Sequence, residues 1–81
     1  MKATKERVRG FITENYLLGD TRRLGDQESL LDTGVIDSTA VMELVDWLQR
    51  TFAIRIDDEE LVPANLDSLD RITAYVVRKA A

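Results

Sequence analysis

Apolar residues recur at helical spacing in three parts of this chain. The parts are residues 3–17, the stretch from Ser38 to Phe52, and residues 66–79. In each, the apolar side chains fall on one face and most charged side chains lie elsewhere, as in a helix packed on a core. The expected core positions are Val8, Phe11, Ile12 and Tyr16; Val41, Leu44, Val45, Leu48 and Phe52; and Leu66, Leu69, Ile72, Thr73 and Val76.

Polar residues and glycines indicate where these helices begin and end. The residues expected at helix ends are Thr4, Asp37 and Asn65 as N-caps and Gly19 as a stop. Residues 53–56 read as an extended connector, from which Ile54 or Ile56 reaches inward. Residues 57–60, Asp-Asp-Glu-Glu, open a short third helix, with Asp57 as its cap and Glu60 in the capping-box position. Pro63 prevents much extension of that helix.

A long polar segment, residues 19–36, separates the first two main helices. Leu30 and Leu31 interrupt it, and we expect both to anchor it to the core as an ordered loop. The whole pattern predicts an all-α fold: a small four-helix bundle of three main helices and one short helix, with a long first loop. The length predicts a single domain over residues 1–81.

The composition excludes several kinds of chemistry. The chain has 81 residues, 44% of them hydrophobic, and it contains no cysteine and no histidine. Disulfides, thiolate metal sites and Ser-His-Asp catalysis are therefore excluded within this chain, and we expect it to be neither an enzyme nor a metal-binding protein. A helix N-terminus accounts for the acidic run at residues 57–60, because acids there complement the helix dipole.

Charge and hydropathy narrow the expected partners. Residues 26–70 contain twelve acidic residues against Arg50 and Arg55, and the whole chain has a net charge of −4. This acidic centre would repel nucleic acid and suits partners with a basic docking surface. No apolar run approaches membrane-spanning length and no charged-then-apolar leader opens the chain. We expect a cytoplasmic monomer without membrane insertion.

The start of the second helix carries the main candidate site. With Asp37 as N-cap, Ser38 lies on the first turn, at the positive end of the helix dipole and facing solvent, where an attached phosphate is favoured. The alternative is that Ser38 only completes a cap. Farther along this helix, Met42 and Trp47 fall off the buried stripe, beside Glu43 and Asp46. These four residues indicate a recognition surface; alternatively, Met42, Trp47 or both tuck against the long loop.

The stretch Gly34-Val35-Ile36-Asp37-Ser38, with Glu43-Leu44 following, resembles the attachment segment of acyl carrier proteins and peptidyl carrier domains. The resemblance covers nearly the whole chain. It includes Leu30-Leu31, Phe52, Ile56, the acidic turn at 57–60 and Asn65-Leu66, in the family's order and spacing. The pair Val35-Ile36 resembles free-standing carriers that are loaded by separate adenylating ligases, such as D-alanyl and aminoacyl carriers, more than it resembles the carriers of fatty-acid synthesis. Thr39 departs from the family, which usually has an apolar residue there.

The resemblance implies a carrier function. Ser38 would receive 4′-phosphopantetheine from coenzyme A through a magnesium-dependent phosphopantetheinyl transferase, and Asp37 would position the serine or the metal of that transferase. The thiol of the arm would hold an acyl or aminoacyl group as a thioester. A loading ligase and downstream acyl-transfer enzymes would dock on Met42, Glu43, Asp46 and Trp47. The alternative function is a helical interaction module without a prosthetic group.

Two competing sites can be tested on the sequence. Asp67-Ser68-Leu69 contains the family's literal Asp-Ser-Leu string, but no glycine loop precedes it and no Glu-Leu pair follows it. Ser68 also falls where a small polar residue completes a helix cap, so we assign the attachment to Ser38. The stretch from Asp32 to Glu43 has the length of an EF-hand loop. It has Gly34 and Ile36 where calcium ligands belong, which excludes calcium binding through this loop.

Overall fold

The fold is built from helices, in agreement with the predicted all-α class. The computed structural model describes residues 2–17 and 24–80 and contains no strand within them. Its elements are α1 (Lys2–Tyr16), α2 (Ser38–Phe52), the 3₁₀ turn η1 (Asp58–Glu60), the single-turn α3 (Pro63–Leu66) and α4 (Leu69–Ala80). The three long helices match the three predicted ones. None of the helices in this part of the chain is both long and apolar enough to cross a membrane.

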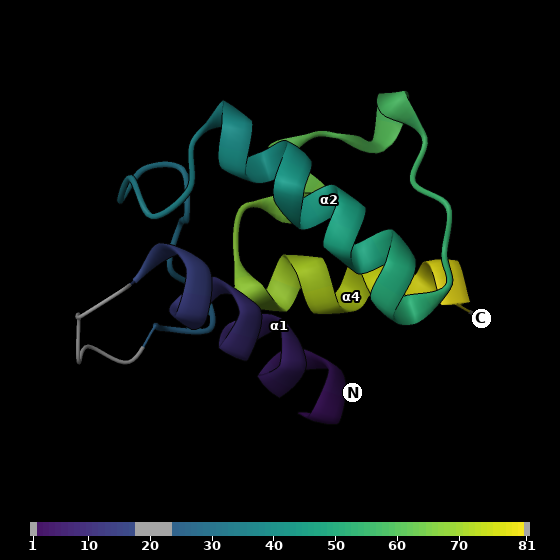
Figure 1. Ribbon diagram of the computed structural model, residues 1–81, viewed down its shortest axis with the longest axis horizontal. Coiled ribbons are helices and arrows are strands. Elements are labelled where there is room, and N and C mark those ends of the chain that lie inside the picture. Colours follow the sequence, from purple (N-terminus) through teal and green to yellow (C-terminus); the bar gives the residue numbers. More distant parts are fainter. Residues whose placement is uncertain (1, 18–23, 81) are drawn as a thin grey trace.

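Helix α4 lies at the centre of the arrangement (Figure 1). Both α1 and α2 pack against it, and the 53–68 segment with η1 and α3 returns the chain from the end of α2 to the start of α4. The buried core runs through all three long helices and the loop before α2. Its fully buried side chains are Val8, Ile12, Leu24, Leu30, Leu44, Leu48, Leu69, Ile72, Tyr75 and Val76. Removal of this apolar surface from water is the main force that holds the helices together.

The loop before α2 is anchored by one leucine and one aspartate. Leu30 is fully buried, whereas Leu31 is 39% exposed, so the expectation that both leucines anchor the loop is wrong for Leu31. Asp67 supplies the second anchor. Its backbone carbonyl accepts from the Leu30 N–H at 2.8 Å, and its carboxylate accepts from the Leu31 N–H at 2.9 Å and from the Ser29 hydroxyl at 2.7 Å. These bonds fix the loop without burying a second leucine.

Two predicted caps are wrong. Helix α1 begins at Lys2, so Thr4 lies inside it. Asn65 lies inside α3, where its side-chain amide donates to the Glu60 carbonyl at 2.9 Å. Helix α4 begins only at Leu69, and Ser68 rather than Asn65 accepts from its first turn. Gly19, the expected stop of the first helix, lies outside the described residues.

The predicted capping box at the acidic turn is present. The Asp57 N–H donates to Glu60 Oε1 at 3.1 Å. The same carboxylate oxygen accepts from the Tyr75 hydroxyl at 3.0 Å and from Lys79 Nζ at 2.9 Å, so Glu60 ties the turn to α4. The ion pair with Lys79, followed by the Asp57 N–H, lowers the pKa of Glu60. Of the two isoleucines in the connector, Ile56 is buried and Ile54 only partly so.

Candidate functional site

The backbone before α2 presents Ser38 at the surface. Gly34 has a φ of +76°, a conformation that glycine adopts without strain. Two residues later, Ile36 is buried in the core. Asp37 is extended (φ −115°), and its Oδ1 accepts from the Ala40 N–H at 2.9 Å. This is the predicted N-cap. Ser38 is consequently the first residue of the helix, and its side chain is exposed.

The chain has two Asp-Ser pairs, each at the start of a helix, but the N-cap is the aspartate in one pair and the serine in the other. In the first pair, Asp37 is the cap and Ser38 lies on the exposed first turn. In the second pair, Ser68 occupies the cap position itself: its Oγ accepts from the Arg71 N–H at 3.1 Å, and the residue is only 5% exposed. Asp67 then lies outside the helix and binds the loop. The same dipeptide therefore presents one accessible serine and one that is buried and hydrogen-bonded.

A hollow of about 280 Å³ opens beside Ser38, towards the end of α1. It is lined by Tyr16, Gly34, Val35, Asp37, Thr39, Ala40 and Glu43. The Tyr16 hydroxyl donates to Glu43 Oε1 at 2.8 Å and lies 3.4 Å from the Ala40 carbonyl oxygen. Burial, and then the bond to Glu43, raise the pKa of Tyr16 to about 12. The hydroxyl is therefore protonated near neutral pH and links the end of α1 to the first turns of α2.

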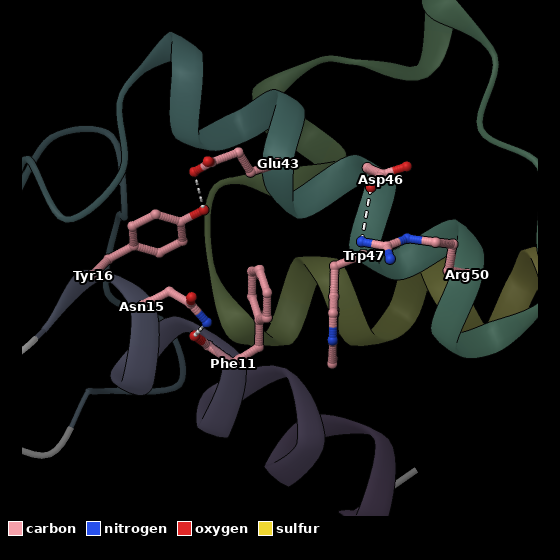
Figure 2. Close-up of a pocket in the computed structure, with 7 residues that line it drawn as sticks. All are labelled: Phe11, Asn15, Tyr16, Glu43, Asp46, Trp47 and Arg50. Carbon is pink, nitrogen blue, oxygen red and sulfur yellow. Dashed lines mark hydrogen bonds and ion pairs between the residues drawn. The ribbon is translucent and has the colours of Figure 1, made fainter.

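A second hollow of the same size continues along the groove between α1 and α2 (Figure 2). It is lined by Phe11, Asn15, Tyr16, Glu43, Asp46, Trp47 and Arg50. The rings of Phe11 and Trp47 stack with centroids 4.5 Å apart, and the Trp47 ring meets Phe52 edge-on at 5.7 Å. On the outer side, Arg50 Nη2 pairs with Asp46 Oδ2 at 2.8 Å. Aromatic faces form one side of the groove and charged groups its rim.

The four predicted docking residues do not share one environment. Met42 is 56% exposed, and Glu43 and Asp46 are also exposed on α2. Trp47 is only partly exposed, because its ring stacks on Phe11 of α1. Tyr16 and its bond to Glu43 were not identified from the sequence. A pairing between residues 27 positions apart leaves no local signal, and Tyr16 reads simply as a core position of the first helix.

Comparison with known proteins identifies the family. Residues 15–76 match the family described as "Phosphopantetheine attachment site". The chain belongs to this family. The carrier protein is also 31% identical over 70 residues to the "Probable acyl carrier protein PigG" of Serratia sp. (strain ATCC 39006), an alignment that covers 86% of this chain and 80% of the other. It is therefore an acyl or peptidyl carrier protein with a covalently attached 4′-phosphopantetheine group, and it works with partner enzymes.

The start of α2 fits such a group. Ser38 offers an exposed hydroxyl, and the positive end of the α2 dipole favours a phosphate nearby. The Asp37 carboxylate lies next to this position and would repel a phosphate, but one of its oxygens already accepts the Ala40 N–H as a cap. The part of the carrier protein that the structure describes contains no group of three or more acidic, histidine or cysteine residues placed to hold a metal ion.

Proposed function

We propose that this carrier protein holds acyl or aminoacyl intermediates on a 4′-phosphopantetheine arm attached to Ser38. The observation that supports this assignment is the difference between the two Asp-Ser pairs. Ser38 is exposed on the first turn of α2, where a transferase can reach its hydroxyl, whereas Ser68 is buried and bonded as the cap of α4. The glycine turn before Ser38 adds to this accessibility.

The proposed attachment forms a phosphodiester between Ser38 Oγ and the phosphopantetheine phosphorus, breaks the pyrophosphate bond of coenzyme A and releases adenosine 3′,5′-bisphosphate. The serine proton would pass to a base of the transferase. The attached arm supplies a thiol that carries cargo as a thioester. The chain itself has neither cysteine nor histidine for such chemistry, so we propose that it is a carrier without turnover of its own. Its partners would be the transferase, a loading ligase and downstream acyl-transfer enzymes.

The proposed attachment is tested by intact mass. The purified protein is incubated with coenzyme A, magnesium and a broad-specificity phosphopantetheinyl transferase, beside the Ser38→Ala and Ser68→Ala variants. We expect one phosphopantetheine adduct on the wild type and on Ser68→Ala, and none on Ser38→Ala. An adduct lost only from Ser68→Ala would move the site to Ser68. No adduct on a folded wild type would favour the interaction module.

We propose further that Met42, Glu43 and Asp46 of α2 form the docking surface for these enzymes, with Trp47 at its edge. Exposed acids next to an exposed methionine suit a weak, salt-sensitive contact with a basic partner. Asp46→Lys and Met42→Ala should each raise the KM of the transferase for this protein several-fold and leave the kcat nearly unchanged. Glu14→Lys, an exposed charge reversal on α1, is the control. An unchanged KM in the two α2 variants would contradict the docking surface.

A further inference from the structure

The hollow between Ser38 and the end of α1 is lined by several polar residues. Asp37 and Thr39, the two neighbours of Ser38 in the chain, both line it, so it opens directly beside the proposed attachment point. Tyr16 and Glu43, which are hydrogen-bonded to each other, also line it. Thr39, which departs from the family pattern, is a polar lining residue at a position where an apolar side chain is usual.

The charge of this hollow determines which part of the phosphopantetheine arm it can bind. The acidic residues Asp37 and Glu43 both line it, so a further anion such as the phosphate is disfavoured inside it. An amide N–H is favoured instead, because a carboxylate has several acceptor positions and the Tyr16 hydroxyl uses only one of those on Glu43. Val35 and Ala40 supply apolar surface in the same hollow. The lining thus suits a neutral chain with amide groups and apolar methylenes.

The other side of α2 offers a different environment. A smaller hollow of about 90 Å³ lies there, and every residue that lines it is apolar: Leu31, Ile36, Val41, Leu61, Val62, Pro63 and Leu66. An amide placed against those side chains would lose its hydrogen bonds to water and find no side-chain partner, which is unfavourable. The polar hollow at Tyr16 is about three times as large, at about 280 Å³, and offers acceptors.

We propose that Tyr16 and Glu43 form a seat for the amide-bearing stretch of the phosphopantetheine arm, on the α1 side of α2. Glu43 accepts an amide N–H from the arm, and Tyr16 fixes the Glu43 carboxylate through the bond from its hydroxyl. Tyr16 is thus a positioning residue. This inference rests on the proposed attachment to Ser38, and it adds to that proposal the side of the helix on which the arm lies.

The test uses protein labelled with ¹³C and ¹⁵N that carries an unlabelled arm, with intact mass confirming the modification. Isotope-filtered NOE spectra of the holo protein should show contacts between the arm protons and the protons of Tyr16, Val35 and Thr39. In Tyr16→Phe these contacts should weaken, because Glu43 is no longer held. The matched control is Tyr75→Phe, since the Tyr75 hydroxyl also donates to a glutamate, at 3.0 Å, but in the pair that ties η1 to α4. That variant should keep the contacts.

Several results would overturn this inference, and they separate it from the proposed attachment. Contacts only to Leu31 and Val62, or an arm without protein contacts, would refute the seat while leaving the attachment intact. The same holds if Tyr16→Phe retains wild-type contact intensities. Failure of the wild type to gain the arm by mass would refute the attachment and the seat together. The NOE pattern of the wild type decides the question even if a variant fails to fold.

Discussion

The substitutions Ser68→Ala and Ser38→Ala should have different effects on stability, because the two serines have different roles at their helix starts. The structure assigns Ser68 to the N-cap of α4, with its Oγ accepting from the Arg71 N–H at 3.1 Å and the residue 5% exposed. Ser68→Ala removes this acceptor and leaves the N–H without its partner. Loss of an N-cap of this kind costs about 1 kcal/mol of unfolding free energy, within a range of about 0.5–2 kcal/mol. Ser38→Ala replaces an exposed side chain and should change stability by less than about 0.5 kcal/mol.

The assay is urea unfolding followed by helical circular dichroism and by the fluorescence of Trp47, the one tryptophan of the chain. A loss of about 1 kcal/mol lowers the urea midpoint by about 1 M when the slope is about 1 kcal/mol per molar urea, and it lowers Tm by about 4–8 °C. Ser68→Gly supplies the matched comparison. Glycine is tolerated at an N-cap almost as well as serine, whereas inside a helix it is about 1 kcal/mol worse than alanine. The reasoning fails if Ser68→Gly is less stable than Ser68→Ala, or if Ser38→Ala is as destabilised as Ser68→Ala.

Two further predictions concern the glycine turn and the acidic turn. Gly34→Ala should destabilise the fold by about 1 kcal/mol in the same urea assay, because its φ of +76° disfavours any side chain although no atom lies within 4 Å of the added Cβ. Gly25→Ala, whose Cβ would meet only ordinary contacts, should stay near wild type, and equal losses would contradict the backbone argument. The pKa of Glu60 is lowered in the folded state. Its contribution to the free energy of unfolding is therefore complete above the ordinary value of 4.5, and it is lost as the pH falls from there through the lowered pKa. Tm should therefore fall less on acidification in Glu60→Gln than in the wild type or in Glu59→Gln, and identical acid profiles would refute this.

Local patterns in the sequence were sufficient for much of the fold and for the candidate serine. The spacing of Leu44, Val45 and Leu48 predicts α2, and the burial of these three side chains confirms it. The glycine and Asp37 before the helix predict the cap, and the Ala40 N–H makes the expected bond to it. Both signals lie within one or two helical turns. Such interactions depend on backbone geometry that every helix shares, and for that reason they can be read from a single sequence.

Local patterns were therefore enough to predict the all-helical class, the three long helices and the exposed position of Ser38. Local patterns did not predict four features that the folded chain shows: the start of α4, the exposure of Leu31, the stacking of Trp47 on Phe11 and the Tyr16–Glu43 bond. Each of these depends on where a distant segment lies. Asp67 can bind the loop only because the chain between α3 and α4 lies beside Leu30, and Tyr16 can reach Glu43 only because α1 and α2 pack on the same helix. Side-chain periodicity fixes which face of a helix is buried, but the partner of that face is set by packing of the whole chain.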